Sequence, residues 1–212
     1  LMRQAALEHL DGATIAMAHR GRLNVLTNIV GKSYSELFRE FDGTQSIEGS
    51  GDVKYHLGAR GSYRTESGAV FPVAMAANPS HLEAVDAVSM GITRAQQDRK
   101  PERRYAILPI IIHGDAAMAG QGVVSETVQM TKLPAYDIGG TIRVTVNNQI
   151  GFTTLPSEAR TSTYATDVVK AVQTPVLHVN GDDPEAVVRA ARLALEYRQT
   201  FHRDIVIDLV CY

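Results

Sequence analysis

The chain has 212 residues, of which 44% are hydrophobic and 21% are charged, and its formal net charge is -2. This length and apolar content suffice for one α/β domain with its own core, and the charge gives no indication of nucleic-acid binding. No apolar run approaches the roughly 20 residues of a membrane-spanning helix. Because Cys211 is the only cysteine, we expect no internal disulfide and a reducing compartment, the cytoplasm of a bacterium or the mitochondrial matrix of a eukaryote.

Short apolar runs that suit buried strands alternate with segments of helical length. The runs lie at 13–19, 70–76, 105–114, 141–148, 175–181 and 204–210. Several of them are apolar on both faces, which is typical of parallel strands covered by helices on either side. We therefore predict an α/β fold, with a parallel sheet, helices on both faces and a Rossmann-like arrangement.

Helix-start signals stand between these runs. Capping-box spacing or an N-cap acceptor before proline occurs at Ser33 with Glu36, Ser80 with Glu83, and Asp183 with Pro184. The last signal predicts a crossover helix over 184–201, with Val188, Ala191 and Ala194 or Leu195 on its buried face.

Residues 42–68 are rich in glycine and serine and show no sustained period of 2 or 3.6. We predict a long functional loop there, because long loops inside compact domains usually carry function. Leu1 starts the chain and the apolar run 204–210 nearly ends it. We therefore expect a piece of a longer polypeptide, whose exposed strand edges lack their partners.

Polar residues follow the predicted strands, where an open parallel sheet binds its ligands. They are His19-Arg20-Gly21-Arg22, Asn78-Pro79-Ser80-His81, Gly114-Asp115-Ala116 and Asn147-Asn148-Gln149-Ile150-Gly151. Asp115 and Asn148 stand 33 positions apart, about one strand, helix and strand. A carboxylate, an amide oxygen and a backbone carbonyl can form half of a Mg²⁺ shell that phosphate oxygens and water complete. The alternative for Asp115 is a purely structural role as the cap of the following helix.

Nucleotide-binding motifs do not fit as well. Gly120-Gln121-Gly122 is followed by Ser125 where a dinucleotide-binding fingerprint needs its third glycine, and no glycine-rich run ends in Lys-Ser or Lys-Thr. The segments "GDAAMAGQG" and "VNNQIGFTT" instead resemble the thiamine diphosphate motif. Ala116 departs from the third position of its Gly-Asp-Gly start, but alanine is usual there in one group of the family.

That group is the E1 component of 2-oxoglutarate dehydrogenase, which the chain resembles over nearly its whole length. The blocks that carry the resemblance are "HRGRLNVLTNIVGK", "GSGDVKYHLG", "ANPSHLEAVD", "HGDAAMAGQG", "VNNQIGFTT" and "HVNGDDPEAV". The stretch 59–70 has no clear counterpart in the family. The resemblance implies the thiamine diphosphate-binding version of the predicted fold.

The resemblance also assigns residues. It implies that Asp115, Asn148 and the Ile150 carbonyl hold Mg²⁺. It implies cofactor contacts from these residues and from Arg20, Ser80, Leu82, Ala116 and Ala117. By the same resemblance His19 and His56 face the substrate, while His81 lines the cofactor pocket. All three are the expected catalytic histidines, because imidazoles can bind the carboxylates of a 2-oxo acid and move protons.

Alternatives remain open for several of these polar residues. His19 could be a satisfied histidine at a strand end, and His56 a loop residue in solvent. Arg20 and Arg22 could be solvated charges, and we assign no role to Arg22. His113 is a candidate for a supporting group beside Asp115.

By resemblance, we expect oxidative decarboxylation of 2-oxoglutarate with thiamine diphosphate and Mg²⁺, and succinyl transfer to the lipoyl group of the E2 partner. The alternatives are a 2-oxoadipate-specific E1 and a non-catalytic module that binds Mg²⁺ and phosphate. Residues 1–212 would form the single diphosphate-binding domain, without the pyrimidine-binding domain of such enzymes. We therefore expect a homodimer that shares the cofactor site, and an inactive isolated chain.

Overall fold

A computed structural model of the chain describes residues 1–42, 56–78 and 83–211. Within this part of the chain one seven-stranded sheet has the order β2-β3-β1-β4-β5-β7-β6. The strands are β1 (Gly12–Met17), β2 (Ala59–Arg64), β3 (Val70–Met75), β4 (Ile107–Gly114), β5 (Ile142–Asn147), β6 (Val176–Asn180) and β7 (Ile205–Val210). All neighbours pair in parallel except β2 and β3, which are antiparallel. The α/β prediction is confirmed.

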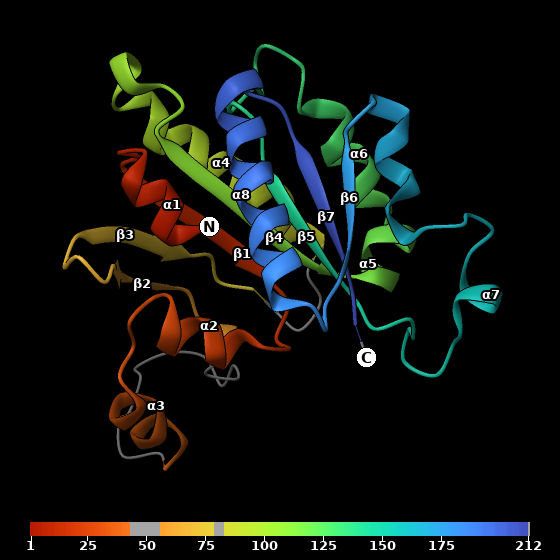
Figure 1. Cartoon of the computed structure of the whole chain (residues 1–212), viewed down its shortest axis with the longest axis horizontal. Coiled ribbons are helices and arrows are strands. Elements are labelled where there is room, and N and C mark those ends of the chain that lie inside the picture. The colour runs from red at the N-terminus through yellow and green to blue at the C-terminus, as the bar shows by residue number, and fades with distance from the viewer. Residues whose placement is uncertain (43–55, 79–82, 212) are drawn as a thin grey trace.

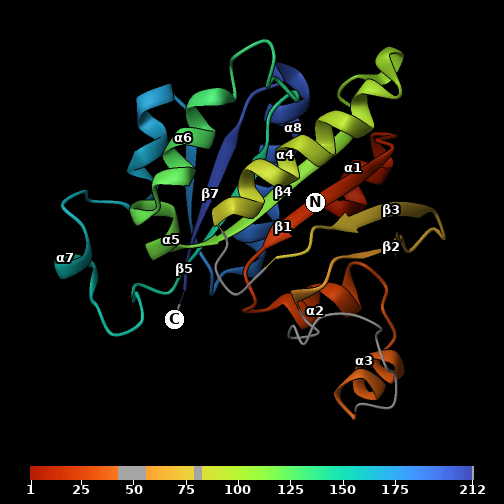
Figure 2. The ribbon, with the colours of Figure 1, turned by 180° about the vertical axis from the view of Figure 1, so that it is seen from behind.

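Helices cover both faces of the sheet. Figure 1 shows α1 (Met2–Leu7) and α8 (Pro184–Phe201) over one face, and Figure 2 shows α4 (Glu83–Asp98) and α6 (Gly122–Met130) over the other. The shorter helical elements are α2 (Arg22–Asn28), α3 (Tyr34–Phe41), η2 (Pro101–Arg103), α5 (Asp115–Gly120), α7 (Pro156–Ala159) and η3 (Ala165–Val172). Consecutive residues of β4 serve opposite faces, since Ile110 packs in the core beneath α1 and α8 and Ile111 packs in the cluster beneath α4. This two-sided burial explains why the strand is apolar throughout.

Two of the three helix-start predictions can be checked, and both are confirmed. Ser33 and Glu36 form a reciprocal capping box at α3, and the Asp183 side chain accepts from the Ala186 N–H at the start of α8. Ser80, the proposed cap of α4, lies outside the described residues.

The predicted buried face of α8 is only partly right. Ala194 and Leu195 are fully buried, and Ala191 packs against the core, but Val188 is 49% exposed. The stripe that meets the core runs through Val187, Ala191 and Ala194, so Val188 lies beside it.

The prediction of a long functional loop over 42–68 is wrong for residues 59–64, which form the edge strand β2, and residues 43–55 of that segment lie outside the described residues. Contacts from outside the segment hold this strand: the Ser62 N–H donates to the Val30 carbonyl at 2.9 Å. That carbonyl oxygen also lies so close to Gly61 that a Cβ there would collide with it. The sheet is therefore mixed, with a single antiparallel pair among the described strands.

The expectation that the last strand presents an unpaired edge is also wrong. β7 lies inside the sheet between β5 and β6, and Ile205, Val206, Ile207 and Asp208 are buried. The edges of the described sheet are β2 and β6. Among the described residues no helix is both long and apolar enough to cross a membrane.

Candidate active site at the carboxyl end of the sheet

Asp115 and Asn148 follow adjacent strands. β4 pairs with β5 in a register that matches Gly114 with Val146, so the next residues of both strands emerge side by side. Asp115 is the first residue of α5, and Asn148 begins the loop after β5. Their separation in the sequence thus becomes proximity at one edge of the sheet, as the predicted metal site requires.

Asp115 sits in a buried environment that suits a cation. Its side chain is 5% exposed, and burial raises the pKa of its carboxyl. Hydrogen bonds from the backbone N–H groups of Ala116 and Asp115 itself, and the charge of Arg160, act in the opposite direction and lower that pKa. Arg160 lies 3.7 Å away, so the carboxylate has only a distant ion-pair partner within the described chain. Gly114, not Asp115, is the N-cap residue of α5, although the Asp115 carboxylate accepts from N–H groups in the first turn of this helix.

The loop after β5 folds back onto α5. Gly151 approaches Ala116 so closely that a Cβ on Gly151 would lie 2.9 Å from the Ala116 Cβ. Together with Asp115 and Arg160, these two residues line a small cavity of about 70 Å³. Ile150 is 40% exposed in this loop. Ala117, the remaining predicted cofactor contact in α5, follows in the first turn of the helix.

Asn147 fixes the start of this loop. Its side-chain oxygen accepts from the Gln149 N–H at 3.1 Å, and Gln149 adopts a left-handed conformation with φ 60°. Its amide nitrogen donates to the buried Asp208 carboxylate of β7 at 3.2 Å. By contrast, the Asn148 side chain makes no hydrogen bond within the described residues, so its oxygen remains available for a ligand.

The predicted substrate-facing residues gather at the neighbouring strand ends. His19 and Arg20 are exposed in the turn between β1 and α2. His56 is 6% exposed, so the alternative of a loop residue in solvent is wrong. Its carbonyl accepts from the Asn78 N–H at 2.8 Å, and Asn78 follows β3, the neighbour of β1. His19 therefore lies at the end of β1, and His56 lies beside the end of the neighbouring strand β3.

Arg22 holds these segments together. It is 1% exposed and donates to the carbonyls of Met17, Leu57 and Ala76 at 3.2, 2.8 and 2.7 Å. These carbonyls belong to the end of β1, the residue after His56 and the residue after β3. The reading of Arg22 as a solvated charge is wrong, and its burial lowers its pKa.

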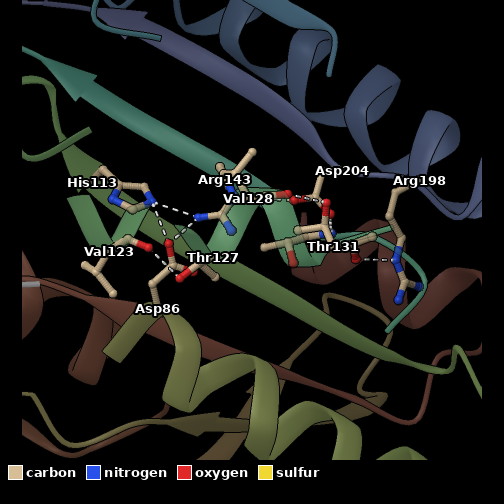
Figure 3. A network of polar contacts seen from close by, with 11 residues as sticks. Asp86, His113, Val123, Thr127, Val128, Thr131, Arg143, Arg198 and Asp204 are labelled. Carbon is tan, nitrogen blue, oxygen red and sulfur yellow. Dashed lines mark hydrogen bonds and ion pairs between the residues drawn. The ribbon is translucent and has the colours of Figure 1, made fainter. Parts of the chain in front are cut away.

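Three predicted site residues, Ser80, His81 and Leu82, lie outside the described residues. His113, the predicted support beside Asp115, has other partners. It is 1% exposed, and Figure 3 shows it facing Arg143 and Asp86, with its Nε2 3.3 Å from the guanidinium and 3.9 Å from the carboxylate. Burial is the main reason that the pKa of His113 falls to about 4, so it is neutral at physiological pH.

The donor set at Asp115, Asn148 and Ile150 fits Mg²⁺ with a diphosphate. It consists of hard oxygens, one of them on a buried carboxylate whose ionised form a cation would stabilise. The described residues contain no cluster of three or more His, Cys, Asp or Glu side chains suited to a metal. Of the three predicted ligands only Asp115 belongs to these residue types, because the other two are the Asn148 amide oxygen and the Ile150 carbonyl. The predicted set is therefore not a cluster of this kind.

Arg160 and Asp208 also belong to this region, and little in the sequence indicates them. Arg160 lies in an irregular segment after α7 and carries no motif. For Asp208, the available signal is a lone carboxylate inside the apolar run "IVIDLV". A buried charge in such a strand needs a partner, and His178 and Asn147 supply it.

Comparison with known proteins agrees with this geometry. The family model described as "Dehydrogenase E1 component" matches residues 2–212. The chain belongs to the dehydrogenase E1 component family. This family of oxidoreductases depends in general on thiamine diphosphate, and its members act on 2-oxo acids.

Curated relatives point in the same direction. The chain is 54% identical to proteins named "Multifunctional 2-oxoglutarate metabolism enzyme" from Mycobacterium sp. strain JLS and from Mycolicibacterium vanbaalenii, over 217 aligned positions in each case. The alignments cover 99% of this chain but only 17% and 18% of those relatives. The chain thus spans under a fifth of the length of the relatives it matches.

Proposed function

We propose that this chain is the thiamine diphosphate-binding domain of an E1 component that oxidatively decarboxylates 2-oxoglutarate. The observation that carries the proposal is the convergence of Asp115 and Asn148 at one sheet edge, in a chain 54% identical to 2-oxoglutarate metabolism enzymes. When bound, thiamine diphosphate would supply the nucleophilic carbon and the electron sink for loss of CO₂.

The chain's own residues would hold the diphosphate end of the cofactor. Asp115, Asn148 and the Ile150 carbonyl would bind Mg²⁺, and Mg²⁺ would bind the phosphate oxygens. Arg20, Ser80, Leu82, Ala116 and Ala117 would complete the cofactor contacts. The close approach of Gly151 to Ala116 supports this assignment, because it keeps the loop that bears Asn148 and Ile150 against the start of α5.

The histidines would act on the substrate. We propose that His19, His56 and His81 bind the carboxylates of the 2-oxo acid and hold or transfer protons during its decarboxylation. The buried Arg22 supports this role for His19 and His56, because its bonds to Met17 and Leu57 keep the two segments together.

The remaining parts of the reaction would come from outside these residues. We propose that residues 1–212 form one diphosphate-binding domain and that a pyrimidine-binding domain lies elsewhere in the protein. The protein would be a homodimer that shares each cofactor between subunits. It would pass the succinyl group to the lipoyl domain of an E2 dihydrolipoyl succinyltransferase.

The full-length protein and its Asp115→Ala variant test this proposal. Thiamine diphosphate is titrated calorimetrically at saturating Mg²⁺, and consumption of 2-oxoglutarate and of 2-oxoadipate is followed with an artificial electron acceptor. We expect the wild type to bind the cofactor and to prefer 2-oxoglutarate. We expect Asp115→Ala to lose about 100-fold in cofactor affinity, the upper end of the roughly 10–100-fold that loss of a group supporting a metal ligand costs.

The other outcomes separate the alternatives. A preference for 2-oxoadipate would change the substrate but keep the cofactor site. Equal cofactor binding by wild type and Asp115→Ala would exclude the metal site. Metal-dependent binding without turnover of either acid would indicate a non-catalytic module.

A further inference from the structure

We propose that Asp208, with His178 and Asn147, is a positioning group that sets the geometry of the loop bearing Asn148 and Ile150. The inference rests on the proposed function, since it takes this loop to be part of the Mg²⁺ site. It assigns a role to three residues that touch neither substrate nor cofactor in that proposal.

Asp208 is a buried charge with two partners. It is fully buried in β7, and one carboxylate oxygen lies 2.8 Å from the Nδ1 of His178 on β6. The other oxygen accepts from the Asn147 amide at the end of β5. A buried carboxylate without such partners would be costly, so the pairing fixes both neighbouring side chains relative to β7.

Asn147 transmits this constraint to the loop. With its nitrogen bound to Asp208, its oxygen faces the Gln149 N–H and accepts from it at 3.1 Å. The backbone also holds this residue, because its carbonyl accepts from the Cys211 N–H at 2.9 Å. Gln149 takes a left-handed conformation that non-glycine residues rarely adopt, so the hydrogen bond from Asn147 helps to maintain it.

The position of this turn decides where the proposed ligands point. Asn148 precedes Gln149 and Ile150 follows it, so a change of the Gln149 backbone torsions changes the position of the Ile150 carbonyl relative to the Asn148 side chain. Mg²⁺ demands nearly ideal octahedral geometry, and groups that orient metal ligands typically change metal affinity by roughly 10–100-fold when they are removed. Asp208 is therefore placed to tune metal affinity without binding the metal.

His178 closes the chain of contacts at the surface. Its side chain is 38% exposed, and its ring centroid lies 4.2 Å from that of Tyr164, which precedes η3, with the two ring planes tilted by 37°. The His178 ring thus shields one side of the Asp208 carboxylate from water and helps to fix the orientation of that carboxylate. Because the ring is partly exposed, its removal should disturb the fold less than the loss of Asp208.

Metal titration of the full-length protein tests the role of Asp208. The apparent Kd for Mg²⁺ is measured by calorimetry at saturating thiamine diphosphate, with the Tm recorded alongside. We expect Asp208→Asn to weaken Mg²⁺ binding about 10-fold and Asp208→Ala by up to about 100-fold, because the asparagine keeps one oxygen for Asn147 and the alanine keeps none. His178→Ala should weaken binding less than Asp208→Asn.

Asp204→Asn is the matched control. Asp204 is a buried carboxylate on the same chain segment as Asp208, roughly 13 Å away at the strand rise of about 3.3 Å per residue, and it pairs with Arg143. We expect this control to lower the Tm and to leave the Kd for Mg²⁺ within twofold of wild type. Equal weakening by Asp204→Asn and Asp208→Asn would overturn the proposal, since the effect would then reflect stability alone.

Further outcomes separate this inference from the proposed function. If Asp115→Ala abolishes metal binding and Asp208→Asn does not weaken it, the positioning role is wrong and the metal site stands. If Asp115→Ala leaves the Kd unchanged, the metal site is wrong and this inference fails with it. Should the Asp208 variants not fold, an unchanged Kd in His178→Ala would overturn the proposal, and a weakened one would support it.

Discussion

Replacement of Arg143 by methionine tests the buried ionic network that Arg143 forms with Asp86 and Asp204. Arg143 is completely buried on β5, 2.5 Å from the Asp86 carboxylate of α4 and 3.4 Å from that of Asp204, the residue before β7. Figure 3 shows the guanidinium between the two carboxylates, with His113 beside it. Burial opposes the charge of Arg143, but the two carboxylates outweigh it and raise its pKa. Methionine is an unbranched, uncharged side chain, so Arg143→Met would leave both carboxylates without their counterion.

The expected loss of stability is large. Removal of one partner from a buried ion pair costs about 3–5 kcal/mol, because the other charge stays buried and unpaired. Two carboxylates share Arg143, so we expect about 5 kcal/mol, a large part of the 5–15 kcal/mol typical of a whole domain. The triple variant Asp86→Asn, Arg143→Met, Asp204→Asn should recover much of this loss, because it buries no unpaired charge.

The loss should depend on pH in a defined direction. Burial raises the pKa of Asp204 above 3.8, and the charge of Arg143 partly counters this. Without Arg143 the folded-state pKa rises further, while the unfolded-state pKa stays the same. The penalty is therefore absent below the unfolded-state pKa, grows as the pH rises toward the folded-state pKa, and is complete above it. Arg143→Met should be closest to wild type in acid and furthest from it at neutral pH.

Urea denaturation of the wild type and of both variants at pH 7.5 and pH 5 measures these differences. We expect the deficit of Arg143→Met to shrink at pH 5. A deficit below about 1 kcal/mol at pH 7.5, the size expected for an exposed pair, would refute the counterion role. So would a deficit that grows on acidification.

Two further variants test the geometry of the candidate site. Arg22→Met removes the donors to Leu57 and Ala76, so we expect a loss of about 3 kcal/mol in the free energy of unfolding, measured by urea denaturation, and a higher KM for the 2-oxo acid. Arg22→Lys keeps a positive charge, so its loss of stability and its rise in KM should both be smaller. An unchanged KM in Arg22→Met would show that Arg22 does not position His19 and His56. Gly151→Ala places a Cβ 2.9 Å from that of Ala116 and so displaces the loop that bears the proposed metal ligands. We expect Mg²⁺-dependent cofactor affinity, measured by calorimetry, to fall about 10-fold, which is the size of effect typical of groups that orient metal ligands. Gly122→Ala is the matched control, because a Cβ there meets no atom within 4 Å, and equal losses in both variants would contradict the steric explanation.

The sequence predicted those parts of the fold that local patterns determine. The runs that became β1, β3, β4, β5, β6 and β7 are apolar because helices cover both faces of the sheet, and that burial is visible in composition alone. β2 was missed because its segment, "ARGSYR", has no apolar period and depends on pairing with β3 and on the Val30 carbonyl. The internal place of β7 was missed because strand order depends on crossovers, which residue patterns do not encode.

The candidate site divides in the same way. Asp115 and Asn148 could be predicted because each directly follows a strand and the parallel β-α-β connection places such ends side by side. Arg22 and Asp208 could not be placed in this way, because their partners lie up to 61 positions away in the sequence and are mostly backbone carbonyls or side chains on other strands. A charged residue in a strand or a helix start has the same local pattern whether it is solvated or buried. The two cases differ in the hydrogen-bond partners that burial requires. The hydrogen bonds of Arg22 and Asp208 reach the segments that carry the proposed substrate-binding residues and metal ligands.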